Sequence, residues 1–369
     1  MSERDEKVRP QTPADIPWSQ RLLHRFDPEF AHHAAIAALR FGLAPKPEPF
    51  DDAILATSVW GLRFANPIGL AAGFDKDAQV IGPMLGIGFG FVEAGSVTPR
   101  PQPGNPKPRL FRLAEDRAVI NRFGFNSDGL EAYVARLRAC RARGDVGGLV
   151  GANVGKNKET VDGAADYVLG VSAVAPLADY IVCNISSPNT PGLRSMQARA
   201  PIADLLARVM QARDAALPAG RPLPPLLAKV GPDLDQAQVE DIAQVALETG
   251  VDGLIVGNTT VERPAGLHSV HASESGGLSG APLLPAANRC LAQFARATAG
   301  ALPIIGCGGV ASGADAYAKI RAGASLVQLY SALVFHGPGL VNRIKRELAE
   351  LLRREGFASV AEAVGADCR

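Results

Sequence analysis

Eight short apolar segments recur along the chain, and a longer stretch with helical spacing follows each of them. Each segment ends in Gly, Ser or Asn, which is typical of a buried strand that leads into a turn. Strands that alternate with helical stretches predict a parallel sheet built from βα units. The eight segments cover residues 68–73, 89–96, 149–155, 179–187, 224–231, 252–258, 303–309 and 325–331. Eight units predict an α/β fold, a closed (β/α)₈ TIM barrel, over residues 50–355.

The segment before the barrel, residues 16–45, has the pattern of a small helical hairpin. Its first helix is indicated by apolar residues at helical spacing, namely Trp18, Leu22, Leu23 and Phe26. Asp27-Pro28-Glu29 then supplies an N-cap and the first turn of a second helix. The apolar face of the second helix consists of Phe30, Ala34, Ala37, Ala38 and Phe41. Basic residues fringe the pair, so the hairpin could lie in a membrane interface or pack on the barrel, and the pattern leaves both open.

Four other segments lie outside the βα units. Residues 1–15 are polar and predict a disordered leader, and residues 45–49 predict a linker. Residues 54–66 predict a short β-hairpin that closes the bottom of the barrel. Residues 356–369 form a C-terminal tail to which the pattern assigns no role.

The composition narrows the class of protein. The 369 residues are 47% hydrophobic and 20% charged, which excludes a disordered or fibrous chain. A formal net charge of +1 makes nucleic acid an unexpected partner. Five scattered cysteines without a CxxC pair predict neither disulfides nor a zinc site, and they indicate a reducing cytoplasm. No apolar run reaches the roughly eighteen residues of a membrane span, and the charged start is not expected to be a secretory signal.

Polar residues gather at the carboxyl ends of the predicted strands, where the functional sites of such barrels lie. These residues are Lys76, Ser96, Asn153, Asn184, Ser187, Lys229, Asn258 and Gly309. Turn formation explains one or two Gly or Asn residues, but it does not explain lysines and serines at the same end. No cluster of His, Cys, Asp or Glu has metal-ligand spacing, so we expect no metal.

Glycines and lysines at these ends indicate the kind of ligand. Gly308-Gly309 after the seventh strand and Tyr330-Ser331 after the eighth match the common phosphate site of such barrels. The chain has neither a GxGxxG after its first strand nor a GxxxxGK[ST] loop, so FMN fits better than NAD or ATP. Lys76 and Lys229 could form Schiff bases, or they could stay charged beside an anionic substrate or a flavin.

The segment NISSPNTPGLR, residues 184–194, offers hydroxyls and amides without the neighbouring histidine or carboxylate of a hydrolytic triad. Further amide and hydroxyl groups come from Asn121, Asn189, Asn258 and Thr259. Together these groups could hold a carboxylate or an imide-like ring by hydrogen bonds.

The strings AAGFDKD, SVTPRPQPGNPKPR, NRFGFN, NISSPNTPGLR, LAKVGPD, GNTT, GGLSG, PIIGCGG and SLVQLYS occur in this order. In their joint occurrence the chain resembles the quinone-dependent class 2 dihydroorotate dehydrogenases of bacterial type, over roughly residues 18–350. The resemblance implies a barrel with one FMN per chain that oxidises (S)-dihydroorotate to orotate in de novo pyrimidine (UMP) biosynthesis. It also implies a membrane quinone as the electron acceptor.

The resemblance also implies roles for individual residues. Ser187, the second serine of NISSPN, would be the base that removes the C5 proton while hydride leaves C6; class 1 enzymes use a cysteine there. The substrate would be contacted by Lys76, Asn121, Arg122, Phe123, Gly124, Phe125, Asn184, Asn189, Asn258 and Thr259. FMN would be held by Ala72, Gly73, Phe74, Asp75, Lys76, Ser96, Asn153, Asn184, Lys229, Gly257, Gly280, Gly309, Tyr330 and Ser331. Lys229 would face the N1/O2 edge of the flavin, where negative charge accumulates on reduction.

The resemblance favours the membrane role of the hairpin, with His32, Arg112 and Tyr330 along a quinone tunnel. It implies a monomer bound peripherally to the cytoplasmic face of the cell membrane. One alternative is a class 1 enzyme, or another FMN barrel, that uses fumarate or a nicotinamide; Ser187 and the hairpin argue against it. The other is a non-catalytic, membrane-associated barrel that binds a phosphorylated ligand.

Overall fold

The computed structural model describes residues 18–45, 47–144, 146–190 and 192–368, so the predicted leader lies outside the described residues. All eight predicted strands are confirmed, and they close into one parallel barrel. In order around the barrel they are β3 (Ile68–Leu70), β4 (Phe91–Val97), β7 (Leu149–Val154), β8 (Tyr180–Asn184), β9 (Leu226–Val230), β10 (Gly253–Val256), β12 (Ile304–Cys307) and β13 (Ala324–Leu329).

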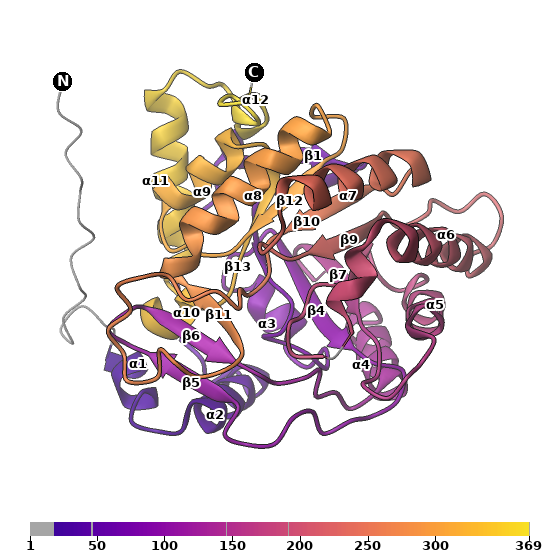
Figure 1. Ribbon diagram of the computed structural model, residues 1–369. Helices are drawn as coiled ribbons and strands as arrows, with labels where there is room; N and C mark the ends of the chain where they lie inside the picture. The colour runs from indigo at the N-terminus through magenta and orange to yellow at the C-terminus, as the bar shows by residue number, and fades with distance from the viewer. Residues whose placement is uncertain (1–17, 46, 145, 191, 369) are drawn as a thin grey trace.

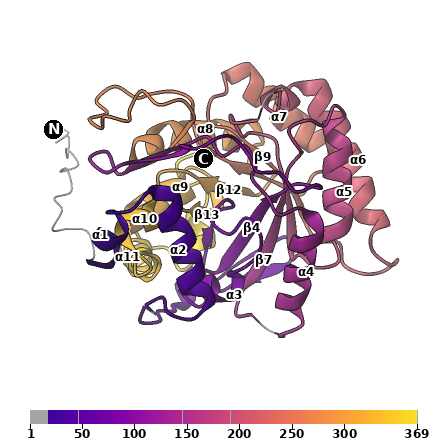
Figure 2. The ribbon, with the colours of Figure 1, turned by 90° about the horizontal axis from the view of Figure 1, so that it is seen from below.

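Helices surround the strands (Figures 1 and 2). Those that follow barrel strands are α3 (Ile81–Leu85), α4 (Leu130–Arg141), α5 (Gly163–Val174), α6 (Arg199–Ala215), α7 (Gln236–Thr249), α8 (Leu284–Ala297), α9 (Gly313–Arg321), α10 (Ala332–His336) and α11 (Leu340–Arg354). Short 3₁₀ turns are η2 (Ala53–Leu55), η3 (Arg194–Gln197) and η4 (Ala281–Leu283). The C-terminal tail contains α12 (Val360–Ala363) and packs on α9, because the Gly365 N–H donates to the Ile320 carbonyl at 3.0 Å.

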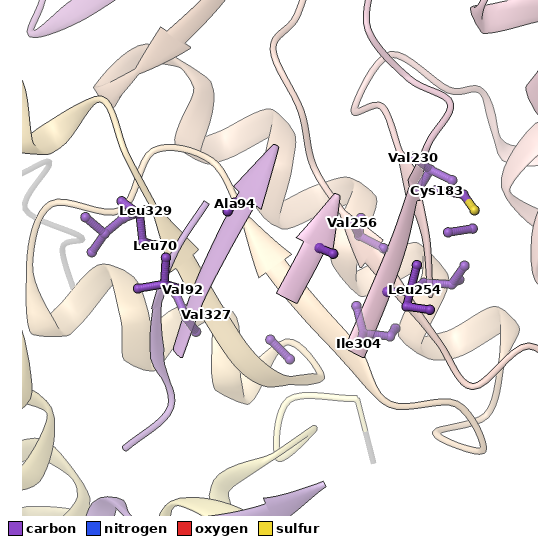
Figure 3. Packing of buried hydrophobic residues seen from close by; sticks show 14 of the residues in the cluster. Leu70, Val92, Ala94, Cys183, Val230, Leu254, Val256, Ile304, Val327 and Leu329 are labelled. Atoms are coloured by element: carbon purple, nitrogen blue, oxygen red, sulfur yellow. The ribbon is translucent and has the colours of Figure 1, made fainter. Parts of the chain in front are cut away.

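Side chains of the barrel strands are buried on both faces of the sheet. Every second residue packs outward against the helices, as Leu70, Val92 and Val327 do in Figure 3. The intervening residues fill the barrel interior. Burial on both faces explains why these strands appear in the sequence as continuous apolar runs rather than as alternating patterns.

The predicted hairpin at the bottom of the barrel is confirmed. It consists of β1 (Thr57–Val59) and β2 (Leu62–Phe64), which pair antiparallel. Phe64 is fully buried, and its ring lies edge-on to that of Phe91 on β4, with 5.4 Å between centroids. The Trp60 indole N–H donates to the Asp252 carbonyl at 2.6 Å, which fastens the hairpin to the start of β10.

A second sheet, which the sequence pattern did not predict, lies over the carboxyl ends of the barrel strands. It contains β5 (Leu110–Leu113), β6 (Ala118–Asn121) and β11 (Gly277–Gly280) in the antiparallel order β11-β6-β5. The first two strands are inserted after β4 and the third after β10. Residues far apart in the sequence therefore form one wall beside the barrel mouth.

The N-terminal helices α1 (Trp18–Leu23) and α2 (Pro28–Arg40) confirm the predicted helical hairpin, and α2 lies beside β5 (Figure 1). The Asp27 carboxylate caps α2 by accepting two backbone N–H groups at 3.0 Å. Packing buries a different face from the apolar face predicted above: Ala31, Ile36 and Leu39 are buried, whereas Phe30 and Phe41 are 58% and 73% exposed. The hairpin thus packs on the barrel and still presents aromatic side chains to the outside.

A buried ion pair joins α2 to Arg109, the residue directly before β5 of the second sheet. The Arg109 guanidinium donates to both carboxylate oxygens of Glu29, at 2.8 and 3.2 Å. Burial alone would raise the pKa of Glu29, but the hydrogen bonds and charges of Arg109 and Lys107 hold the pKa below its usual value. Nη1 of Arg109 donates to the carbonyls of Pro103 and Asn105, so each nitrogen of the buried guanidinium has a partner.

We expect Phe64→Ala to lower the free energy of unfolding by about 3–5 kcal/mol, because it removes a fully buried ring and leaves a cavity. Arg63→Ala is the matched control on the exposed face of the same strand, and it should change stability by no more than about 0.5 kcal/mol. Urea unfolding followed by circular dichroism measures both. Equal effects of the two substitutions would contradict the filling role of the hairpin.

Candidate active site

A cavity of about 390 Å³ opens at the carboxyl ends of the barrel strands and extends to the inner side of α1 and α2. The second sheet forms one of its walls. Most of the predicted site residues line it: His32, Ala72, Gly73, Phe74, Lys76, Ser96, Arg112, Asn121, Phe123, Gly124, Phe125, Asn184, Ser187, Asn189, Lys229, Asn258, Thr259, Gly280, Gly309, Tyr330 and Ser331. One cavity therefore joins the predicted substrate, cofactor and quinone residues.

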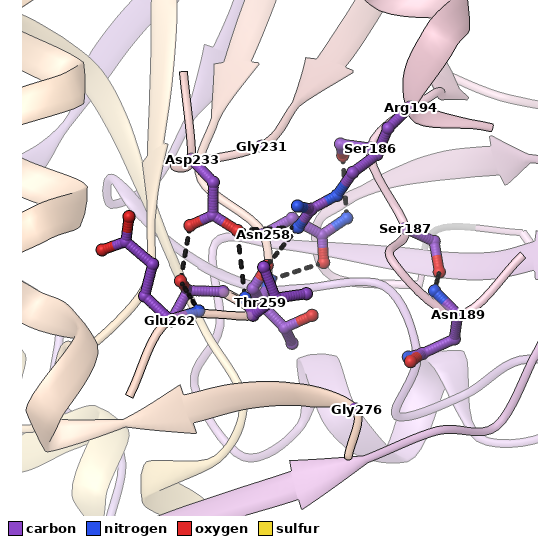
Figure 4. Close-up of polar contacts among 12 residues, drawn as sticks. Ser186, Ser187, Asn189, Arg194, Gly231, Asp233, Asn258, Thr259, Glu262 and Gly276 are labelled. Carbon is purple, nitrogen blue, oxygen red and sulfur yellow. Dashed lines mark hydrogen bonds and ion pairs between the residues drawn. The ribbon is translucent and has the colours of Figure 1, made fainter. Parts of the chain in front are cut away.

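Ser187 lies at the cavity wall and is largely buried. Its Oγ accepts the Asn189 N–H at 3.3 Å, and the Asn189 side-chain amide donates to Asn121 Oδ1 at 3.3 Å (Figure 4 shows the Ser187–Asn189 bond). Among the described residues, no imidazole or carboxylate hydrogen-bonds to Ser187 Oγ. The described contacts of Ser187 Oγ are therefore with an amide of its own segment and not with a base.

Amide groups beside Ser187 form a connected network. Asn258 Nδ2 donates to Ser186 Oγ at 2.8 Å, and Asn184 Nδ2 donates to Ser96 Oγ at 2.7 Å. The Asn184 carbonyl in turn accepts the buried Tyr167 hydroxyl at 2.6 Å. These bonds tie together the carboxyl ends of β4, β8 and β10. They fix the positions of polar groups that could recognise a small planar ligand.

Lys76, on the loop after β3, is a cation that lines the same cavity. Its Nζ donates to Asn126 Oδ1 at 2.5 Å and lies 3.5 Å from the centroid of the Phe123 ring. Burial, and secondarily the charge of Arg109, lower the pKa of Lys76 to about 7. An anionic ligand beside Nζ would favour the charged form and restore a higher pKa.

Glycines shape the cavity after β12. Gly308 and Gly309 have positive φ values of 105° and 81°. A Cβ at position 309 would lie 2.5 Å from the Cα atom of Leu284, so only glycine lets the two backbones approach so closely. The hydroxyls of Ser331 and Ser279, which also line the cavity, are 2.7 Å apart. Exposed backbone N–H groups and hydroxyls of this kind suit a phosphate group.

Four of the predicted site residues do not line the cavity, namely Asp75, Arg122, Asn153 and Gly257. The Asp75 carboxylate accepts two backbone N–H groups of its own loop at 2.7 and 2.8 Å, and burial raises its pKa to about 6. The Arg122 guanidinium instead donates to Glu274 at 2.7 Å. Arg122 directly follows Asn121 at the end of β6, and successive side chains of a strand point to opposite faces.

The other two residues lie just beneath the cavity. Gly257 has a φ of 116°, and a Cβ there would lie 2.1 Å from the Cys307 carbonyl oxygen, so this glycine permits close contact between β10 and β12. Asn153 is fully buried, and its Oδ1 has no hydrogen-bond partner. Among the described residues, no group of three or more His, Cys, Asp or Glu could hold a metal ion.

A buried carboxylate that the sequence analysis did not single out lies under the cavity. Glu93 on β4 is fully buried, lies 3.7 Å from Lys229 Nζ and accepts the Asn153 side-chain N–H at 2.7 Å. Burial and the neighbouring charge of Glu93 raise the pKa of Tyr180, whose protonated hydroxyl donates to Glu93 at 3.4 Å. The sequence feature that could have indicated this buried carboxylate is the acidic residue inside the apolar run FGFVEAGS.

Aromatic rings and two basic residues line the part of the cavity under the hairpin. The ring of His32 is 5.4 Å from Phe74 and 6.4 Å from Tyr330, centroid to centroid. Burial, and then the charge of Lys76, lower the pKa of His32 to about 3, so its imidazole is neutral. Arg112 donates from one terminal nitrogen to the His24 carbonyl at 3.1 Å, while its buried Nε has no partner.

Known proteins resemble this chain over nearly its whole length. The sequence profile of the family described as dihydroorotate dehydrogenase matches residues 54–352. "Dihydroorotate dehydrogenase (quinone)" of Azorhizobium caulinodans is 61% identical over 353 residues, covering 96% of this chain and 99% of that protein. The mitochondrial enzyme of the same name from Mus musculus is 52% identical and covers 96% of this chain and 89% of its own.

Solved structures agree with these relatives. The crystal structure of DHODH from Eimeria tenella in complex with ferulenol superposes with a TM-score of 0.90 at 41% identity. It covers 94% of this chain and 99% of that chain. With a family profile over more than half of the chain and relatives above 50% identity, the chain belongs to the dihydroorotate dehydrogenase family, in its quinone-dependent class of bacterial type.

Proposed function

We propose that this protein oxidises (S)-dihydroorotate to orotate with FMN as its cofactor and a membrane quinone as the electron acceptor, in de novo pyrimidine biosynthesis. The activity follows from its quinone-dependent relatives. The observation that carries the proposal is the single cavity that runs from Ser187 to the N-terminal hairpin. Such a cavity suits one cofactor that meets a polar substrate at one end and an apolar acceptor at the other.

The residues around the cavity fit FMN. The glycines at 308 and 309 and the hydroxyl of Ser331 suit its phosphate, and the partnerless buried Oδ1 of Asn153 can accept the imide N–H of a flavin ring. Lys229 lies at the cavity floor as a cation suited to the N1/O2 edge. When bound, FMN supplies the acceptor for the hydride of the substrate and passes the electrons on to the quinone.

Ser187 would act as the base that takes the C5 proton of dihydroorotate at its Oγ. An isolated serine is a weak base, so the proton must be lost as the bond at C6 breaks, which lowers the demand on its basicity. Its buried position excludes bulk water from the reacting face. The remaining polar groups supply orientation rather than acid strength.

Amides and Lys76 would orient the substrate. Asn121, Asn189 and Asn258 offer both donors and acceptors for the ring amides. The Lys76 ammonium would pair with the substrate carboxylate, which favours its charged form despite a pKa of about 7 without ligand. The loop of Phe123 and Gly124 would close over the same face of the substrate.

The hairpin would admit the quinone from the membrane. His32, Phe74 and Tyr330 form an aromatic passage below α2, and Arg112 is the polar residue on its wall. In the described part of the chain no helix is long and apolar enough to cross a bilayer. Peripheral attachment is supported by the exposed apolar side chains on the hairpin, namely Leu22, Phe26, Phe30, Phe41 and Leu43. We assign this attachment to a monomer on the cytoplasmic face of the membrane.

Anaerobic mixing of the purified protein with dihydroorotate tests the proposed function. Flavin absorbance should bleach, and a short-chain quinone should restore it. Recovery with fumarate or a nicotinamide in place of quinone would contradict the proposed acceptor. A coloured protein that dihydroorotate does not bleach would contradict the substrate, and a colourless one would favour a non-catalytic barrel.

Ser187→Ala should slow flavin reduction by dihydroorotate about 10²–10⁴-fold, because it removes the proposed base, while the FMN content stays that of the unmodified protein. Ser195→Ala is the matched control, since Ser195 is an exposed serine directly after the same segment, in η3, and its Oγ donates to the Gly192 carbonyl. Stopped-flow absorbance in a single turnover measures both variants. Reduction by Ser187→Ala at the unmodified rate would exclude Ser187 as the base.

The double variant Phe30→Ser/Phe41→Ser should lose binding to phospholipid vesicles and turnover with a long-chain quinone, because it removes the two exposed rings of α2 and its end. Flavin reduction by dihydroorotate should be unchanged. Val161→Ser/Val270→Ser, which alters two exposed side chains outside the hairpin, is the control. Vesicle co-sedimentation measures membrane binding, and a steady-state assay measures turnover with the quinone. Full vesicle binding by the hairpin variant would mean that the hairpin only packs against the protein.

A further inference from the structure

Glu93 is a charged residue in the barrel interior to which the proposed mechanism gives no role. Its carboxylate has no exposed surface and four polar neighbours from other strands. It accepts Asn153 Nδ2 at 2.7 Å, Gln328 Nε2 at 2.6 Å and the Tyr180 hydroxyl at 3.4 Å, and it lies 3.7 Å from Lys229 Nζ. A buried carboxylate with this many partners is built into the fold.

These contacts cross the inside of the barrel. β4, which carries Glu93, is separated from the strand of Gln328 by β3 and from the strand of Lys229 by β7 and β8. Side chains on strands this far apart in the wall meet only through the interior. Phe91, two residues before Glu93 on the same strand, packs on Phe64 of the bottom hairpin. The polar groups therefore form a layer between that apolar filling and the cavity, which Lys229 also lines.

The carboxylate determines which way two amides point. An ionised carboxylate only accepts hydrogen bonds, so Asn153 and Gln328 must both turn their NH₂ groups toward it. Their oxygens, Asn153 Oδ1 and Gln328 Oε1, consequently point away from Glu93, and both are buried without a partner. A neutral amide at position 93 would not impose this orientation, because it can donate as well as accept.

We propose that Glu93 is a positioning residue for the flavin: it fixes the orientation of the Asn153 and Gln328 amides beneath the cavity and holds the Lys229 ammonium, which lines the cavity, so that the flavin ring meets a partly neutralised cation. This inference rests on the proposed function, since it requires FMN in the cavity. The negative charge of Glu93 offsets the attraction of Lys229 for the negative charge that a flavin gains on reduction. Glu93 thus sets both how firmly FMN is held and how easily it is reduced.

Glu93→Gln tests both effects, because it keeps the shape of the side chain while removing the charge and adding a donor. We expect a higher midpoint potential of the bound flavin and dissociation of FMN that is faster by about tenfold or more. Asp166→Asn is the matched control: Asp166 is a buried carboxylate on α5 that accepts the Asn157 N–H at 2.7 Å and does not line the cavity. Its potential and FMN dissociation rate should equal those of the unmodified protein.

The exchange variant Glu93→Gln/Gln328→Glu keeps the net charge and one carboxylate–amide pair across the same contact. It therefore tests the role of the carboxylate even if the single variant Glu93→Gln does not fold. The amide now at position 93 can donate to the carboxylate now at position 328 and still accept from Asn153, so slow FMN dissociation should return. A lowered melting temperature in Glu93→Gln, with unchanged potential and FMN dissociation, would overturn the proposal and leave Glu93 a purely structural role. FMN dissociation from the exchange variant that stays fast would overturn it as well.

Measurements on the unmodified protein distinguish failure of this inference from failure of the proposed function. If the unmodified chain carries no flavin, or if dihydroorotate fails to bleach it, the proposed function is wrong. If the unmodified chain is reduced normally and Glu93→Gln has the same flavin potential and FMN dissociation rate, only the role of Glu93 is wrong.

Discussion

Closure of eight parallel strands into a barrel is the constraint on which the rest of this structure depends. A closed sheet has no free edge, so every strand is buried on both faces and the interior must be filled. Phe64 of the bottom hairpin and Phe91 fill the lower part, and polar groups around Glu93 lie above them. Closure also brings all the carboxyl ends to one rim, where a single cavity collects side chains from distant segments.

Charges removed from water inside this fold are placed where several partners satisfy them. Glu29 and Arg109 join α2 to the second sheet through two hydrogen bonds, and two backbone carbonyls accept from the Nη1 nitrogen of the guanidinium. Glu93 and Lys229 lie together under the cavity. Such pairs contribute little net stability, but loss of one partner leaves an uncompensated buried charge. They therefore fix the position of the hairpin and of the cavity floor more than they strengthen the core.

The N-terminal hairpin packs on the body of the protein with one side and leaves the other side exposed. Ala31, Ile36 and Leu39 pack inward, while His32 lies against Phe74 and Tyr330 and lines the cavity. The opposite side carries exposed aromatic rings. The two alternatives that the sequence left open are thus compatible, because a helix presents one face to the barrel while another remains free.

The sequence by itself determined the eight strands, the bottom hairpin and the two N-terminal helices, because apolar runs and the Asp27-Pro28-Glu29 cap are local signals. The sequence also predicted most of the residues that line the cavity, because the carboxyl end of each strand can be recognised without knowing which strands lie next to it. Only the tertiary structure decided which side chains meet across the barrel. Glu93 and Gln328 are 235 positions apart in the sequence. The Arg122 side chain points away from the cavity and donates to Glu274. β11, which follows β10 in the sequence, pairs with β6 in the second sheet. These relations depend on closure and strand order, which no local pattern encodes.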